Sequence, residues 1–489
     1  MPGAPLGCDT GIARAARAGA PGSWAALVTS ILASSLAFVD GSVVNVGLPA
    51  IGRKLGADAA ALQWTVNAYL LPLSALLLFG GAIGDRFGAG RLLAIGVALF
   101  AAASAGCAVA PDLGWLLAAR AAQGVGAAMV LPNSLAVLGG AFQGPARARA
   151  IGLWAAASAI SAALGPVLGG WLIDVWSWRA IFLINLPLAA AAIGFALAGV
   201  RDLKPDGPGP PLDIAGAVLG AGALGGLAWA LTIGSGTGGW TAPAFGLLLA
   251  GLVLTGAFVM VERARGERAM TPPALLASRR LGGLNLMTFL LYGALGGFLV
   301  LLPYLLITSA HYRATAAGAA FLPFPLVMAV GGPVMGALAG KLGSRLLLVI
   351  GPLIAAAGFA LALRVGADGA YLATVLPSVL LVALGMACAA APLTAAVLSA
   401  VDQRHQGVAS GMNSAVARAG GLAATALLGG VLSATGQGLV TAFHTAAIAG
   451  VIIAAAASAS AWWAYRGSDS PLVPAKAGTQ DRSEPEPPQ

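Results

Sequence analysis

The sequence predicts an all-α integral membrane protein with 14 transmembrane helices and both termini in the cytoplasm. Of its 489 residues, 59% are hydrophobic and only 9% are charged, so most of the surface has to face lipid rather than water. Fourteen apolar runs are long enough to cross a hydrocarbon core of roughly 30 Å, which takes about 20 helical residues. The sequence lacks the short strands of alternating polarity that a lipid-facing barrel requires.

The apolar runs divide the chain into two similar parts around a short linker. Polar, Pro-bearing segments at 201–213 and 262–280 bracket the seventh and eighth runs. We therefore expect a cytoplasmic tail, a six-helix bundle, a linker with two inserted helices, a second six-helix bundle and a disordered tail, at 1–23, 24–200, 201–280, 281–464 and 465–489. The fourteen runs lie near 24–50, 63–83, 91–110, 113–138, 149–173, 180–199, 212–234, 243–262, 284–308, 316–339, 344–364, 370–398, 408–432 and 439–464.

Lys and Arg set the predicted orientation. With both ends inside, 19 of the 26 basic residues fall in cytoplasmic segments, five fall outside and two lie within spans, and an odd number of helices would destroy this asymmetry. The net charge of +9 then indicates topology and attraction to anionic lipid rather than nucleic-acid binding. The three cysteines are scattered, which predicts neither a disulfide framework nor a metal site.

A glycine-rich segment recurs in both halves of the chain. Gly81–Gly88 (GAIGDRFG) is expected to form a loop between the second and third spans, and Gly336–Gly343 (GALAGKLG) repeats its spacing between the tenth and eleventh. The glycines permit a tight turn, and Asp85 can accept hydrogen bonds from Arg86 or Arg91. The acid is missing from the second copy. Duplicated halves are how many transporters form a central cavity.

Small residues are closely spaced along the fifth run. They let two helices approach closely, and the proline bends the helix and frees a carbonyl group. Packing alone would also explain such spacing. The residues are Gly152, Ser161, Gly165, Pro166, Gly169 and Gly170.

These motifs resemble those of a known transporter family. The Gly81–Gly88 segment with Arg91 is similar to the signature of the major facilitator superfamily, where it latches the outward-facing state, and the fifth run resembles its antiporter motif, with Ser161 where glycine is usual. The stretches 178–187 (WRAIFLINLP) and 38–49 (FVDGSVVNVGLP) resemble the fourteen-helix drug:proton antiporters.

The resemblance covers residues 24–464 and implies a function. It implies a twelve-helix core with two inserted helices, located in the cytoplasmic membrane of a bacterium and acting as a monomer. Such a protein exports small amphipathic organic compounds and is driven by the proton-motive force, with no cofactor, metal or enzymatic reaction.

Two embedded charges are the candidates for proton coupling. Asp40, in the first run, lies roughly 13 Å below the outer end of its helix, and Arg120, in the fourth, lies roughly 10 Å deep, by the rise of a helix. A charge at this depth costs at least about 2.5–3.5 kcal/mol and is usually functional. An unpaired buried carboxylate binds a proton readily, whereas a nearby Arg favours its charged form. A site that alternates between these surroundings could load and release protons, although a static ion pair remains the alternative.

Aromatic and polar residues on the spans that line the cavity in this family are candidates for substrate binding. No second embedded acid accompanies them, and Arg418 adds a positive charge, which favours neutral or anionic compounds over lipophilic dications. The candidates are Asn45, Asn67, Tyr69, Asn133, Trp154, Asn285, Phe289, Tyr292, Phe321, Phe324, Asn413 and Arg418.

Other functions fit these features less well; a sensor or scaffold, for example, would be expected to carry a soluble signalling domain, for which the tails are too short. A proton-coupled uptake symporter of the same fold is the main alternative. A membrane enzyme would need clustered catalytic or metal-binding residues, and ATP-driven export would need a Gly-x4-Gly-Lys-Ser/Thr loop, and the sequence has neither.

Overall fold

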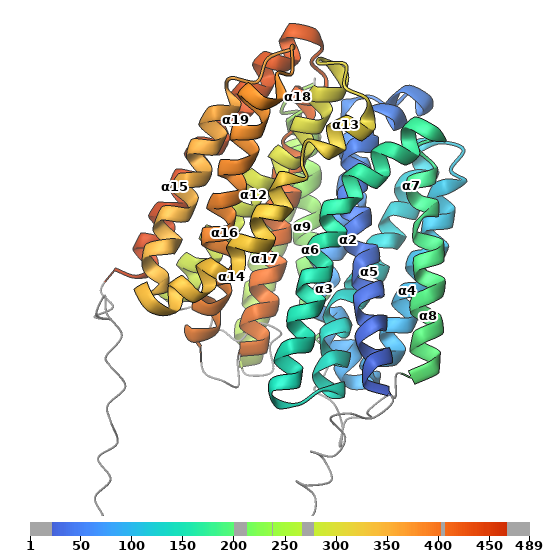
Figure 1. The fold of residues 1–489 in the computed structure, drawn as a ribbon, viewed down its shortest axis with the longest axis vertical. Coiled ribbons are helices and arrows are strands. Elements are labelled where there is room, and N and C mark those ends of the chain that lie inside the picture. Colours follow the sequence, from blue (N-terminus) through green and yellow to red (C-terminus); the bar gives the residue numbers. More distant parts are fainter. Residues whose placement is uncertain (1–21, 200–212, 237, 267–277, 402–405, 467–489) are drawn as a thin grey trace, which may run out of the picture.

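The computed structural model describes residues 22–199, 213–236, 238–266, 278–401 and 406–466, which are almost entirely helical and contain no strand (Figure 1). The predicted tails and most of the two polar linker segments lie outside these residues. The all-helical membrane fold predicted from composition is confirmed. The first part of the chain forms α2 (Gly22–Leu55), α3 (Ala59–Phe87), α4 (Ala89–Ala108), α5 (Leu113–Ala141), α6 (Gly144–Val175), α7 (Ala180–Leu183) and α8 (Asn185–Gly199).

Two helices, α9 (Ile214–Gly234) and α10 (Ala242–Arg265), follow and pack against each other. Asp213 caps α9 by accepting from the Gly216 N–H at 2.6 Å and also pairs with Arg265 of α10. The second half contains α12 (Arg279–Thr308), α13 (Ala314–Ala319), α14 (Pro323–Leu342), α15 (Ser344–Ala362), η2 (Tyr371–Val375), α16 (Leu376–Ser399), α17 (Gln406–Ala426), α18 (Gly429–Leu432) and α19 (Gly436–Ala464).

Twelve of the described helices are long and apolar enough to cross a membrane, or up to thirteen if the bent α3 is taken as a single span. Every predicted run overlaps a described helix. The twelve do not include α17, whose sequence is less hydrophobic and contains Arg418.

The glycine-rich segments differ from the loops expected of them. Residues 81–87 form the last turns of α3, and only Gly88 leaves the helix, with φ of +104°. Gly343, with φ of +84°, ends α14 in the same way. The expectation of a loop was therefore wrong for all but the final residue. A helix satisfies its own backbone groups, so it continues past the apolar part of a span until a residue that tolerates positive φ stops it.

The two halves meet through small residues at the end of the molecule where α2 finishes and α3 begins. A Cβ atom on Gly170 of α6 would lie 2.3 Å from the Ala314 carbonyl oxygen of α13. A Cβ on Gly318 would lie 2.1 Å from the Pro166 carbonyl oxygen. Asp174 accepts from the N–H and the hydroxyl of Thr315, at 3.0 and 2.6 Å. The backbones of α6 and α13 therefore touch directly.

A second contact at the same end joins α3, α17 and α9. Gln63 donates to the carbonyl oxygens of Thr425 and Ala426 at 3.1 and 3.3 Å, and the Thr425 hydroxyl donates to Asn67. The inserted helix α9 takes part, because its C-cap residue Ser235 donates to the Ala426 carbonyl at 2.7 Å. We call the α6–α13 and α3–α17–α9 contacts together the closed end.

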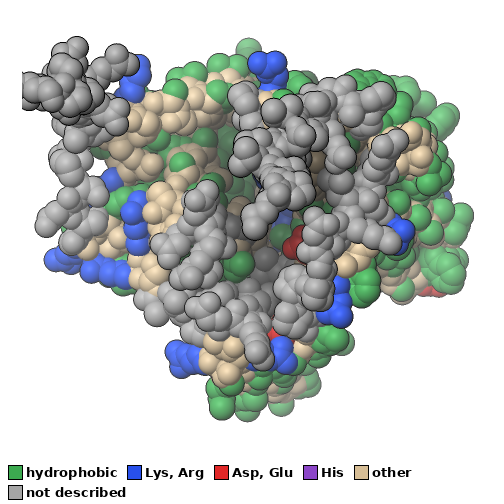
Figure 2. Space-filling model, turned by 90° about the horizontal axis from the view of Figure 1, so that it is seen from below, with side chains coloured by type: hydrophobic (Ala, Val, Ile, Leu, Met, Phe, Trp, Pro, Cys, Tyr) green, Lys and Arg blue, Asp and Glu red, His purple; other side chains and the backbone are tan. Residues whose placement is uncertain are grey.

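The opposite face is the one at which α2 begins and α19 finishes. Seen from that side, the molecule is recessed toward its centre, and Lys and Arg side chains are spread around the described surface (Figure 2). Among the described residues, the close backbone approaches between the halves at Gly170 and Gly318 lie at the closed end.

We predict that Gly170→Ala opens the closed end. The added methyl group meets a backbone oxygen that cannot rotate away, which costs about 1–3 kcal/mol unless the halves separate. The measurement is labelling of Ala426→Cys, a fully buried position, by a membrane-impermeant maleimide in a chain whose native cysteines are replaced by alanine. Labelling should become several-fold faster.

Gly152→Ala is the matched control on the same helix, because a Cβ there meets nothing within 4 Å. It should leave the labelling rate unchanged. Equal rates in the two variants would contradict the proposed role of the α6–α13 contact.

Candidate functional site

Asp40 lies near the middle of α2 and is completely enclosed within the first half. Its exposed fraction is 0%, and that of Arg120 on α5 is 1%. The two side chains form an ion pair between the Arg120 Nη1 and Asp40 Oδ2 atoms. The structure thus brings together the two embedded charges that the sequence placed at similar depth.

Both oxygens of the Asp40 carboxylate accept hydrogen bonds. Oδ1 accepts from Gln123 Nε2 at 3.1 Å and from Asn185 Nδ2 at 3.2 Å, while Oδ2 accepts from Arg120. Gln123 and Asn185 each also donate to the hydroxyl of Ser104, at 2.7 and 3.3 Å. A buried charge is tolerated only when it is paired and hydrogen-bonded in this way.

Arg120 is held from several directions at once. Its Nε donates to the Thr65 carbonyl oxygen at 3.1 Å, and its Nη1 donates to Gln123 Oε1 at 2.9 Å. The guanidinium carbon lies 4.5 Å from the ring centre of Tyr69 and 5.8 Å from that of Phe182, which adds cation–π attraction. Side chains from α2, α3, α4, α5, α7 and α8 therefore meet around one charge pair.

Sequence reasoning gave no role to Gln123, Asn185 or Ser104. A signal was available for each. Gln123 follows Arg120 by three positions and so shares its helix face. Asn185 is the only polar residue between 180 and 199, and Ser104 is the only polar one between 92 and 108 apart from the buried thiol of Cys107. A single polar residue in an apolar span needs a partner, which here is the Asp40 network.

The segment predicted as a latch lies at the recessed face. Asp85, Arg86 and Arg91 are exposed at the junction of α3 and α4. Gly81 lies beside Pro132 of α5, where an added Cβ would make ordinary contact at 3.4 Å. No described contact tests whether this segment latches one conformation of the protein, so that role stays a prediction.

The motif on α6 packs this helix against α2. A Cβ on Gly165 would lie 2.0 Å from the Ser42 hydroxyl, and one on Gly169 would lie 2.0 Å from Val43 Cγ2. Ser161 donates to the Ser35 hydroxyl at 2.8 Å. Gly170 and Pro166 instead contact the other half, as described above. Of the six residues, only Gly152 has open space beside it.

The candidate cavity residues divide into enclosed and accessible ones. Asn67 belongs to the closed end, Asn133 donates to the carbonyls of Gly80 and Met129, and Phe321 packs on Phe298 within the second half. Tyr69 covers Arg120. The remaining candidates are at least partly accessible: Asn45, Trp154, Asn285, Phe289, Tyr292, Phe324, Asn413 and Arg418. Trp154 donates to Ser34, and Asn413 accepts from Thr288.

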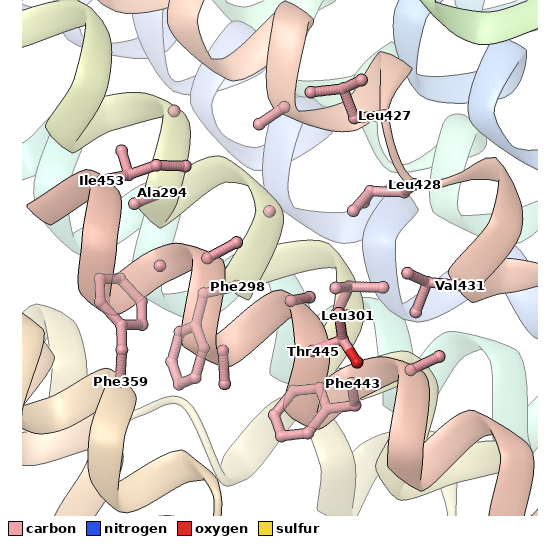
Figure 3. A pocket seen from close by; sticks show the side chains of 18 of the residues that line it. Ala294, Phe298, Leu301, Phe359, Leu427, Leu428, Val431, Phe443, Thr445 and Ile453 are labelled. Carbon is pink, nitrogen blue, oxygen red and sulfur yellow. The ribbon is translucent and has the colours of Figure 1, made fainter. Parts of the chain in front are cut away.

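An apolar pocket of about 510 Å³ lies elsewhere, in the second half (Figure 3). Phe298 and Leu301 of α12, Leu428 beyond α17 and Phe443 and Ile453 of α19 are among its lining residues. None of the candidate cavity residues lines it. Within the described residues, no group of three or more His, Cys, Asp or Glu side chains is placed to hold a metal ion.

We predict that the Asp40–Arg120 pair is essential to stability as a pair. Arg120→Met leaves a buried carboxylate without its cation and should destabilise the protein by about 3–5 kcal/mol. The double variant Asp40→Leu/Arg120→Met removes both charges and should recover more than half of that loss. Unfolding in detergent, followed by intrinsic fluorescence, measures both. If Arg120→Met proved as stable as the double variant, the contributions of Asp40 and Arg120 to stability would not be coupled.

Comparison with known proteins agrees with the motifs. Residues 30–261 and 284–487 match the family model described as Major Facilitator Superfamily. The chain is 36% identical to the puromycin resistance protein pur8 of Streptomyces alboniger over 83% of this chain and 81% of that protein. It is 36% identical to the cephamycin export protein CmcT of Amycolatopsis lactamdurans, over 84% and 85% of the two chains.

A further relative and two solved structures extend the comparison. The methylenomycin A resistance protein of Bacillus subtilis (strain 168) is 32% identical, over 84% of this chain and 88% of that one. A peptide transporter POT in complex with sulfate shares the fold, with a TM-score of 0.65 at 18% identity, covering 90% of this chain and 94% of that one.

A bacterial homologue of the lysosomal transporter Spinster, in an inward-facing and unoccupied conformation, gives a TM-score of 0.61 at 17% identity, covering 92% and 98%. The resemblance seen in the motifs is confirmed, and this chain is a multi-pass membrane protein that belongs to the Major Facilitator Superfamily.

Proposed function

We propose that the protein exports small amphipathic organic compounds, such as an antibiotic or other drug, across the bacterial cytoplasmic membrane. The observation that carries this proposal is the set of relatives named as resistance and export proteins, which match across more than four fifths of the chain. Fourteen spans are part of the proposal. It counts α17 as a span, although its Arg418 lowers its hydropathy, because α17 packs between α12 and α3.

The conformation supports a transport cycle of alternating access. In such a cycle the two halves rock about a site that opens to one side at a time. Here the halves touch at the closed end and are recessed at the opposite face, where Arg and Lys side chains are spread (Figure 2). Basic residues favour the cytoplasmic side, so this conformation corresponds to one that is open to the cytoplasm. Both chain ends would then be cytoplasmic.

The buried charge pair supports coupling of export to protons. Asp40 is fully enclosed, and Arg120, Gln123 and Asn185 all donate hydrogen bonds to its carboxylate. A motion that withdraws Arg120 would favour protonation of the carboxylate, and its return would expel the proton. A proton moving down 100 mV supplies about 2.3 kcal/mol, which can bias a two-state equilibrium substantially. With a single deep acid, the simplest cycle uses one proton.

Proton-coupled uptake by the same fold is the alternative. The peptide transporter described above resembles this chain in fold alone, so the likeness does not favour uptake over export. The direction of flux distinguishes the two. With inside-out vesicles energised by acid inside, an exporter accumulates the compound in the vesicle, whereas a symporter releases it.

We predict that Asp40→Asn abolishes proton-coupled export. The amide is close in size to the carboxylate but cannot bind and release a proton at neutral pH. Dye or drug accumulation driven by an imposed pH gradient in vesicles should fall to the level of empty vesicles. The rate of accumulation is divided by the amount of folded protein in the membrane, because the variant also leaves Arg120 without its anionic partner.

Asp112→Asn is the matched control. Asp112 is exposed and caps α5 by accepting from the Trp115 N–H at 2.9 Å, and asparagine caps helices equally well. This variant should transport normally. Undiminished, gradient-driven transport by Asp40→Asn would rule out Asp40 as the coupling residue.

A further inference from the structure

Arg418 differs from the other deeply placed charges because it has no partner. It lies in the middle of α17 and is partly buried. Among the described residues, no hydrogen bond or ion pair involves it, whereas Arg120 and Asp40 form an ion pair with each other. The other described acidic residues lie at or near the ends of helices, far from the middle of a span.

The direction in which Arg418 points follows from its neighbours on α17. Thr425 lies seven residues later, two turns along the helix and on nearly the same face. The Thr425 hydroxyl bonds Asn67 of α3, so this face of α17 is turned toward the first half. Arg418 therefore faces the first half from about 10 Å below the closed end, given the rise of a helix.

Two tyrosines mark the surroundings of the guanidinium group. Its charge lies within electrostatic range of the hydroxyls of Tyr69, on α3, and Tyr292, on α12. The Tyr69 hydroxyl is already used, since it donates to the Ala37 carbonyl at 3.1 Å. Tyr292 has no hydrogen-bond partner among the described residues. The cation and one free hydroxyl thus lie within electrostatic range of each other, on the packed helices α17 and α12.

An unpaired cation at this depth carries a large cost. Insertion of an Arg at the centre of a span costs about 2.5–3.5 kcal/mol or more, and a protein retains such a charge where it performs a task. Because no acidic side chain in the described part of the chain is placed to neutralise Arg418, we assign a net positive charge to the region between the halves. The ligand best suited to it brings a negative charge of its own.

We propose that Arg418, with Tyr292 beside it, binds an acidic group on the exported compound, so that the preferred substrates are amphipathic organic anions such as aromatic carboxylates. This inference rests on the proposed export function and narrows its substrate class. The planar guanidinium can form two parallel hydrogen bonds to a carboxylate, while aromatic and apolar residues accommodate the rest of the molecule.

The test compares matched compounds that differ only in charge. A panel of fluorescent aromatic carboxylates and their primary amides, starting with 9-anthracenecarboxylate and 9-anthracenecarboxamide, is presented to cells that lack their own exporters. The cationic dye ethidium is included. Export is measured as protonophore-sensitive exclusion by the wild type, Arg418→Gln, Arg418→Lys and Arg364→Gln. Arg364 is exposed at the end of α15, and Arg364→Gln is the control because it removes one positive charge, as Arg418→Gln does.

The wild type should export the acids with a KM about ten- to hundredfold lower than that for the amides, as expected for a charged hydrogen bond. Arg418→Gln should remove this preference, Arg418→Lys should keep part of it, and Arg364→Gln should keep all of it. Arg418→Gln should still export any amide that the wild type exports, which shows that it folds.

Two results would overturn the proposal. One is a wild type that exports amides or ethidium but shows no preference for acids. The other is an acid preference that survives in Arg418→Gln, which would place the acidic group elsewhere. Failure to export any compound of any class would instead contradict the export function itself.

Discussion

The ion pair between Asp40 and Arg120 is the interaction around which the first half is assembled. Removing two charges from water is costly, and their attraction compensates only if every remaining donor and acceptor is also satisfied. Gln123, Asn185 and Ser104 supply hydrogen bonds to this network from three different helices, and Thr65 adds a backbone carbonyl. The packing of these helices is therefore set by polar geometry at their centre as well as by the apolar contacts around it.

The contact between the halves has a different character from the packing within them. At the closed end, backbones approach through Gly170 and Gly318, hydrogen bonds join α3, α9 and α17, and one apolar cluster includes residues of both halves. Neither of the two ion pairs described above crosses this contact, so separating it leaves none of these charges without its partner. The proposed transport cycle would move each half as a rigid body about this contact.

Sequence reasoning accounted for the helices well and for their neighbours only in part. In a membrane, the backbone groups of long apolar runs can be satisfied only if the runs form helices. Asp40 and Arg120 carry opposite charges at similar predicted depths, and this was enough to suggest that they pair. The remaining members of the network could not be derived, because which face of α4 or α8 turns toward α2 depends on packing that no local pattern records. The same limit explains Asn133 and Phe321, whose residue types suit a cavity but whose helices turn them inward. Glycine and charge around Asp85 predict a loop, yet α3 continues to Phe87, because a helix needs no apolar surroundings to continue.

The distribution of charge has an electrical consequence. The Asp40–Arg120 pair is neutral as a unit, so carrying it through a conformational change moves no net charge across the membrane. Arg418 is not compensated, and a potential of 100 mV acts on each displaced elementary charge with about 2.3 kcal/mol. An interior-negative cell would therefore draw the empty carrier toward its inward-open form, ready to receive cargo. A bound anion would cancel the charge of Arg418. The voltage would then oppose the change to the outward-open form far less for the loaded carrier than for the empty carrier.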